Sequence, residues 1–303
     1  MLRSALLGAA DNRGLQGFVT KHGRRLGAYR FVAGETLDEF MDAVRATNER
    51  GMRVAAGLLG EDVRNRDDAS AVAAEYCKIL DRFAAAGADA NVALKLTHLG
   101  LLIDRELAAA NLTAVATKAA EHRNFVRIDM EQSAHTDVTL HIYRTLRTRG
   151  VDNLGAVLQS YLYRSEGDLR SLLPLAPSVR LVKGAYLEPP DVAFPNKRDV
   201  DRNYVRLLEL SLREGGFTAV ATHDDAIIEH AIEFVQSHAI SRQRFEFQML
   251  YGVRPKLQSS VVGRGFALRI AVPFGSQWYP YFMRRLAERP ANVLFMLRSM
   301  WRG

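Results

Sequence analysis

Residues 179–186 read Val179-Arg180-Leu181-Val182-Lys183-Gly184-Ala185-Tyr186, a short apolar and β-branched run that carries two basic side chains and reaches a glycine. Such a run is typical of a buried strand that ends in a turn. Seven similar runs occur along the chain. Together the eight runs occupy residues 53–58, 91–96, 125–130, 155–161, 179–185, 217–222, 245–250 and 267–272. Their recurrence indicates a repeated unit that contains one strand.

Amphipathic stretches with helical spacing separate most of these runs. They occupy residues 69–86, 105–122, 137–149, 203–213 and 226–238. Gly87, Gly150 and Gly265 mark three of the boundaries, as glycine does at element ends. Eight strand–helix units in about 250 residues favour a (β/α)8 barrel of TIM type over an open, doubly wound sheet.

One main domain with helical additions is expected. Thr36, with Glu39 three residues later, is a candidate N-cap of a helix that precedes the first run. The predicted organisation is an N-terminal helical segment at residues 1–50, a catalytic barrel at 51–289 and a C-terminal helix at 290–303.

The composition of the 303 residues is that of an ordinary globular protein, with 48% hydrophobic and 25% charged residues. No apolar run approaches the ~20 residues of a membrane-spanning helix. Cys77 is the only cysteine, so the chain can form neither an internal disulfide nor a thiolate zinc site. These features suit the reducing cytoplasm.

The net charge of +7 is concentrated at the two ends of the chain. Residues 1–30 carry +5 and residues 284–303 carry +4, which leaves −2 for the rest. No basic stripe interleaved with aromatic residues crosses the middle, so no nucleic-acid partner is expected. The tail at 292–301 could form an interfacial helix, giving peripheral contact at the inner face of the membrane, or could pack on the barrel.

Polar or ionisable side chains interrupt the apolar runs near their carboxyl ends, where barrel enzymes place their chemistry. They are Lys95, Asp129, Gln159, Lys183, His223 and Gln248. One such residue is usually a satisfied core group, but six unpaired groups would cost ~1–3 kcal/mol each, so a converging site is the simpler interpretation. Apart from weak candidates such as His98 and His223, the histidines do not fall at metal-ligand spacing, so a metal is disfavoured and none is assigned.

A second candidate feature follows the eighth run. Tyr281, Arg284, Arg285 and Glu288 have the i, i+3, i+4, i+7 spacing of one helix face. Adjacent arginines beside a barrel mouth are suited to bidentate binding of a small carboxylate. A solvated basic face with an Arg284–Glu288 pair explains the same spacing.

Three segments carry a family resemblance. They are residues 179–186, Phe245-Glu246-Phe247-Gln248-Met249-Leu250-Tyr251-Gly252, and Trp278-Tyr279-Pro280-Tyr281-Phe282-Met283-Arg284-Arg285-Leu286-Ala287-Glu288-Arg289. Together they resemble the proline dehydrogenase family, in its short monofunctional bacterial form. The resemblance implies a distorted (β/α)8 barrel that binds FAD and oxidises L-proline to 1-pyrroline-5-carboxylate, the first step of proline catabolism. It also implies hydride transfer to flavin N5 and a quinone as electron acceptor.

The same resemblance assigns roles to individual residues. For the cofactor they are Asp129, Gln159, Arg180, Lys183, Gly184, Thr222, His223 and Gln248. For the substrate and catalysis they are Lys95, Asp129, Tyr186, Leu250, Ala271, Tyr281, Arg284, Arg285 and Glu288. Arg180 would lie near flavin N5, and Arg284 and Arg285 would pair with the substrate carboxylate. Lys95 and Glu288 would form a pair that closes the site. No residue is a clear general base.

One position departs from the family pattern. The family commonly has a tyrosine two residues before the proline that follows the eighth strand, and this chain has Ala271 before Pro273. Alanine removes one wall of the pocket for the proline ring unless Phe274 or another side chain fills the space. A looser site that accepts 4-hydroxyproline or another cyclic amino acid is therefore an alternative.

Two other function classes remain open at this stage. A Schiff-base aldolase on a barrel could use Lys95 or Lys183 as its nucleophile. A barrel without enzymatic activity could bind nucleic acid or anionic lipid through its basic ends, and its binding would then depend steeply on salt. Neither of these two classes requires a flavin.

Overall fold

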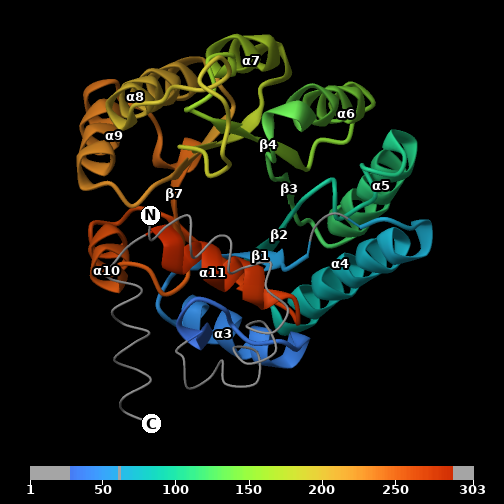
Figure 1. The fold of residues 1–303 in the computed structure, drawn as a ribbon. Coiled ribbons are helices and arrows are strands. Elements are labelled where there is room, and N and C mark those ends of the chain that lie inside the picture. Colours follow the sequence, from blue (N-terminus) through green and yellow to red (C-terminus); the bar gives the residue numbers. More distant parts are fainter. Residues whose placement is uncertain (1–27, 61–62, 289–303) are drawn as a thin grey trace.

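The computed structural model describes residues 28–60 and 63–288, and residues 28 and 284–288 by their backbone alone. In this part of the chain eight parallel strands pair in sequence order, and β8 pairs with β1 to close a barrel (Figure 1). The strands are β1 Arg53–Leu58, β2 Ala90–Leu94, β3 Val126–Ile128, β4 Leu154–Gln159, β5 Ser178–Val182, β6 Phe217–Ala221, β7 Phe245–Leu250 and β8 Leu268–Phe274. The predicted (β/α)8 barrel is confirmed.

Helices connect successive strands and surround the barrel (Figure 1). The α-helices are α3 Leu37–Glu49, α4 Arg66–Ala86, α5 Arg105–Glu121, α6 Thr136–Thr148, α7 Ser165–Leu172, α8 Lys197–Glu214, α9 Asp225–Ser237, α10 Pro255–Gly263 and α11 Trp278–Glu288. Short 3-10 helices are η1 Ala28–Arg30, η2 Ser133–His135, η3 Leu173–Leu175 and η4 Arg242–Arg244. None of the described helices has both the length and the apolar character needed to cross a membrane.

Each of the eight predicted runs overlaps one strand, but the ends differ. The runs at 53–58 and 245–250 match β1 and β7, whereas β3 is only three residues long. Helices α7 and α10 were not predicted, because each is short, and α8 starts at Lys197 rather than at residue 203. The helices expected within residues 1–27 and at 290–303 lie outside the described residues.

Helix α3 begins where the sequence predicts. The Thr36 hydroxyl accepts a hydrogen bond from the Glu39 N–H (3.2 Å), and the Glu39 carboxylate accepts one from the Thr36 N–H (3.2 Å). This capping box satisfies backbone donors that the first turn leaves open. The helix packs on β1 and β8, where Phe40 stacks on Phe274 with ring centroids 4.1 Å apart. It thereby covers the outside of the barrel where the first and last strands meet.

Helix α11 has a different position. Its Trp278 and Phe282 are buried in a small apolar cluster with Phe31, and Leu59 and Val253 pack against that cluster. Leu59 directly follows β1 and Val253 lies just beyond β7, so α11 lies over the carboxyl ends of these strands. Figure 1 shows α11 inside the ring formed by α3 to α10. The last described helix thus leaves the outer ring of helices and lies over the barrel mouth.

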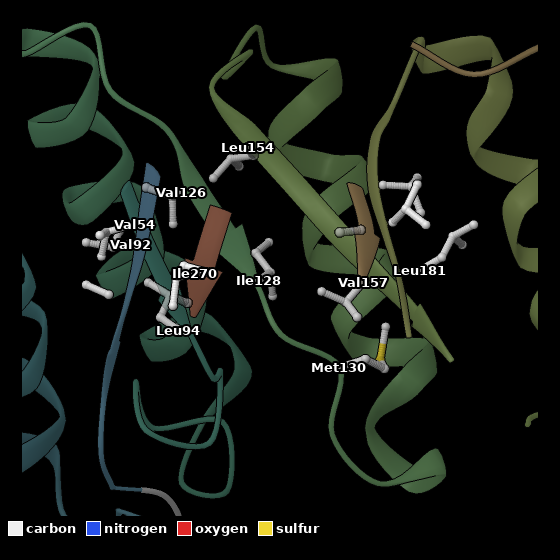
Figure 2. Packing of buried hydrophobic residues seen from close by; sticks show 14 of the residues in the cluster. Val54, Val92, Leu94, Val126, Ile128, Met130, Leu154, Val157, Leu181 and Ile270 are labelled. Carbon is white, nitrogen blue, oxygen red and sulfur yellow. The ribbon is translucent and has the colours of Figure 1, made fainter. Parts of the chain in front are cut away.

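The strands present apolar residues to the helices and a different set to the barrel interior. Figure 2 shows residues of the apolar layer, among them Val54, Ile128 and Ile270, in one continuous buried cluster. The alternate positions carry small side chains, such as Ala55 and Ala93, and several charged ones. Since successive strand residues point to opposite faces, these small and charged side chains face the interior.

One interior arginine is accommodated by a glycine. Arg127 is buried, and its Nη1 donates to the carbonyl oxygens of Ser178 (2.7 Å) and Ala156 (3.1 Å). Gly155 lies beside Arg127 in the strand register. A Cβ on Gly155 would lie 2.2 Å from Arg127 Nη1 and 2.6 Å from Phe125. Arg127 therefore occupies the space that a side chain at position 155 would need.

Gly155→Ala is expected to lower the free energy of unfolding by about 1–3 kcal/mol, the usual cost of overfilling a packed interior. Denaturant unfolding of the two proteins measures this difference. Gly167→Ala is the matched control, because nothing lies within 4 Å of its added Cβ and Gly167 lies in helix α7. There alanine should be neutral or stabilise by up to about 1 kcal/mol. Equal effects at the two positions would contradict this account.

Candidate functional site

Most of the predicted site residues lie at or near the carboxyl ends of the strands, at the end of the barrel where α11 covers β1 and β7. Lys95 and Asp129 directly follow β2 and β3, and Gln159 is the last residue of β4. Arg180 lies within β5 and Gln248 within β7. Because all eight strands are parallel, these positions surround one end of the barrel. The fold thus brings together residues that are up to 153 positions apart in the sequence.

An ion pair between Asp129 and Arg180 lies at the centre of this group. Arg180 Nη1 donates to Asp129 Oδ1 at 2.6 Å, and the guanidinium is nearly buried. The Arg180 Nε is also buried, and it has no hydrogen-bond partner among the described residues. A buried donor without a partner is costly, so this N–H is suited to a ligand that supplies an acceptor.

Two buried amides contribute acceptors. Gln159 Nε2 donates to the Glu131 carbonyl oxygen (2.9 Å), and Gln248 Nε2 donates to Glu246 Oε1 (2.7 Å). The Glu131 carboxylate in turn accepts from the backbone N–H (3.2 Å) and the hydroxyl (2.5 Å) of Thr97. Both amides are therefore held through their nitrogen, and each has a carbonyl oxygen to offer to a ligand.

Lys183 is held by two carboxylates. Its Nζ lies 2.5 Å from Asp201 Oδ1 and 2.9 Å from Asp224 Oδ2. The hydrogen bond from Lys183 lowers the pKa of Asp224. Burial opposes ionisation of Asp201, but hydrogen bonds from Lys183 and Lys197 outweigh it, and the pKa of Asp201 is also lowered. Lys183 is thus a fixed ammonium group at the strand ends.

The tautomer of His223 follows from its contacts. The Leu250 backbone N–H donates to His223 Nε2 at 3.0 Å. A backbone N–H can only donate, so Nε2 carries no proton and the neutral ring carries its proton on Nδ1. Arg254 Nη1 donates to the His223 carbonyl oxygen (2.7 Å) and pairs with Asp225, which holds this turn in place. The neighbouring Thr222 is buried, and its hydroxyl accepts from the Asp224 N–H.

The loop after β5 depends on a glycine. Gly184 has φ +110°, and a Cβ there would lie 2.3 Å from the Tyr161 ring. Further along, the Glu188 carboxylate accepts from the N–H (2.7 Å) and the hydroxyl (2.5 Å) of Ser133. These contacts tie the loop after β5 to the loop after β3. Tyr186, which is half-buried, lies between the two contacts in sequence.

The remaining predicted residues are placed less completely. Ala271 pairs with Leu250 in the β7–β8 register, and both are half-buried. Tyr281 packs against the apolar cluster beneath α11. Arg284, Arg285 and Glu288 lie in α11 as predicted, but their side chains lie outside the described part of the structure.

Comparison with known proteins identifies the family. The family model described as proline dehydrogenase matches residues 40–298. The chain belongs to the proline dehydrogenase family. It is 42% identical over 300 residues to proline dehydrogenase 1 of Bacillus subtilis, with 99% of each chain covered. It is 43% identical over 280 residues to the proline dehydrogenase of Deinococcus radiodurans, covering 91% of this chain and 90% of that one.

The fold is also similar to that of a solved structure. A crystal structure of proline utilization A from Bdellovibrio bacteriovorus, inactivated by N-propargylglycine, superposes with a TM-score of 0.83. The match covers 94% of this chain and 36% of that one, at 23% sequence identity. At that identity the comparison establishes the TIM-type barrel alone.

In this member of the proline dehydrogenase family, several site residues have partners that were not predicted from the sequence. Asp201 and Asp224, which hold Lys183, and Glu246, which holds Gln248, were given no role. Glu246 precedes Gln248 by two residues, so strand alternation alone places both on one face. Asp201 lies in α8, and no sequence pattern relates it to Lys183. Among the described residues no cluster of three or more potential metal ligands occurs.

Lys183→Met is expected to lower the unfolding free energy by about 1 kcal/mol near pH 7, because the partly exposed carboxylates of Asp201 and Asp224 lose one of the two lysines that contact them both. Their folded-state pKa values are depressed, so this stabilisation is present above the ordinary Asp pKa of about 3.9 and is lost as pH falls through the folded values. The difference between wild type and variant should therefore shrink below about pH 4.

Denaturant unfolding at a series of pH values measures that difference. Lys78→Met is the control, because Lys78 forms an exposed pair with Glu75 on α4 and should contribute little at any pH. A difference between wild type and Lys183→Met that widens in acid would contradict the ion-pair account.

Proposed function

We propose that this chain binds FAD across the strand ends and uses it to oxidise L-proline to 1-pyrroline-5-carboxylate. Membership of a flavin-dependent family of proline dehydrogenases supports the reaction. The structural observation that carries the cofactor proposal is the buried, unpartnered Nε of Arg180, held in place through Nη1 by Asp129. FAD, when bound, accepts the hydride from the carbon next to the proline nitrogen.

The residues at the strand ends fit an electron-rich flavin ring. Arg180 supplies a buried cation and a free donor, which stabilise negative charge on the reduced cofactor. Lys183 adds a fixed ammonium group, and Gln159 adds an acceptor. With Gly184, whose missing side chain lets the loop approach Tyr161, these residues form the proposed cofactor site. Thr222, His223, Gln248 and Asp129 complete it.

The proposed substrate site lies between the cofactor residues and α11. We assign Arg284 and Arg285 to the proline carboxylate, because paired guanidinium groups bind a carboxylate with fixed geometry. Holding the carboxylate of a small rigid ring also fixes the position of its reacting carbon. The residues assigned to the ring pocket and its closure are Lys95, Asp129, Tyr186, Leu250, Ala271, Tyr281 and Glu288. The electron acceptor that we propose is a quinone.

Anaerobic addition of L-proline to the purified protein tests the central proposal. The protein is expected to be yellow, and its flavin absorbance should bleach as hydride reaches the cofactor. A water-soluble quinone should then restore the absorbance. Single-turnover spectroscopy follows both changes.

The alternatives give different spectra. A Schiff-base aldolase that uses Lys95 or Lys183 would be colourless and would be trapped by borohydride together with a carbonyl substrate. A yellow protein whose spectrum stays oxidised with proline would retain the cofactor proposal and refute the substrate. Failure of quinones to reoxidise the bleached protein would refute only the acceptor.

Ala271 supports a broader substrate range as a second proposal. Phe274 does not replace the missing aromatic wall, because it is buried and stacked on Phe40 of α3, on the helix side of β8. Ala271 alternates with Phe274 along the strand and faces the interior opposite Leu250. Phe274 therefore does not fill the space that a tyrosine at position 271 would occupy, and we propose 4-hydroxyproline as an additional substrate.

Ala271→Tyr is expected to lower kcat/KM for 4-hydroxyproline by about tenfold or more, because the ring would fill the space for the hydroxyl, while kcat/KM for proline rises or stays constant. Steady-state kinetics on both substrates with the same preparation measure the ratio, and proline is the internal control. If wild type strongly prefers proline and the ratio does not change in the variant, the broader range is refuted.

A further inference from the structure

A buried carboxylate inside the barrel lies directly below the proposed cofactor site. Glu246 is 2% exposed, and its oxygens accept from Arg269 Nε (2.7 Å), Arg269 Nη2 (3.3 Å) and Arg53 Nη1 (3.3 Å). Arg269 also donates to the Val54 carbonyl oxygen at 2.9 Å. Although burial opposes ionisation, the charge of Arg269 lowers the pKa of Glu246. Glu246 is therefore an anion fixed in place by two arginines.

The fourth contact of Glu246 points toward the strand ends. Gln248, two residues closer to the carboxyl end of β7, donates from Nε2 to Glu246 Oε1 at 2.7 Å. A carboxylate can only accept, so the amide nitrogen of Gln248 must face Glu246. The two polar atoms of an amide lie on opposite sides of its carbonyl carbon. The Gln248 Oε1 is consequently turned away from Glu246, and no described residue donates to it.

We propose that Glu246 is a positioning residue that sets the polarity of the cofactor site: by holding the Gln248 amide nitrogen, it presents Gln248 Oε1 to the flavin as a hydrogen-bond acceptor. This inference rests on the proposed binding of FAD. It predicts that Gln248 Oε1 accepts a hydrogen bond from an N–H or O–H group of the cofactor. Glu246 itself does not touch the cofactor and acts through Gln248.

The central variant is Glu246→Met, which keeps the length of the side chain but removes the oxygen that holds the Gln248 amide. Glu246 Oε1 accepts from both Arg269 Nε and Gln248 Nε2, each at 2.7 Å. Without this acceptor the Gln248 amide is free to turn over and present its NH2 to the cofactor, so that a donor meets a donor. FAD release from the diluted holoenzyme, followed by flavin fluorescence, is expected to show about tenfold or weaker binding, together with a shifted visible spectrum.

Two further variants separate this reversal from loss of stability. Glu246→Gln removes the same charge as Glu246→Met, but its amide oxygen in the place of Oε1 still accepts from Arg269 Nε and Gln248 Nε2, so it should bind FAD more tightly than Glu246→Met. Gln248→Met removes the amide without breaking a buried ion pair and should weaken FAD binding to a similar extent. Asp168→Asn is the control. It disturbs the contact between the half-exposed Arg164 and the buried Asp168 carboxylate on α7, and it should leave FAD release unchanged.

The outcomes are distinguishable. If wild type binds no FAD, the proposed function fails. If wild type binds FAD and Gln248→Met releases it no faster than wild type, Gln248 does not contact the cofactor and this inference is overturned. If Glu246→Met and Glu246→Gln weaken FAD binding equally, the acceptor oxygen of Glu246 does not position Gln248, and the inference is again overturned.

Discussion

Closure of the eight parallel strands is the constraint on which the rest of this structure depends. In a closed barrel the alternate side chains of every strand must share one narrow interior. Small residues such as Ala55 and Ala93 leave room there, and the charged groups Arg127, Glu246 and Arg269 must satisfy one another or backbone carbonyls. The barrel interior consequently contains fixed charges beneath the site and is not a purely apolar core.

This arrangement preorganises the strand ends. Arg180 donates from one nitrogen to Asp129, and Gln159 and Gln248 donate from their amide nitrogens to acceptors of the protein. The atoms that remain, a buried guanidinium N–H and two carbonyl oxygens, are thereby oriented before a ligand arrives. A preorganised polar site avoids reorientation during a reaction, which is the main way proteins stabilise developing charge. The chemistry proposed for the site thus depends on contacts outside it.

The helices at the two ends of the described chain depart from the positions expected in a regular barrel. Helix α3 covers the outer seam between β1 and β8 through Phe40, whereas α11 packs over the mouth through Trp278 and Phe282. Both positions are determined by aromatic packing between segments far apart in the sequence. The result places the helix that bears Arg284 and Arg285 above the carboxyl ends of β1 and β7, as the proposed carboxylate site requires.

The sequence by itself determined the strand–helix repeat, the cap at Thr36 and the polar residues near the strand ends, because alternation, helical spacing and capping are local properties of the chain. It did not determine the short helices α7 and α10, whose few residues carry too weak a periodic signal. Only the tertiary structure decided that Lys183 pairs with Asp201 and Asp224, and which way the Gln248 amide faces. Those contacts join separate elements, and closing the barrel is what brings them within hydrogen-bond distance.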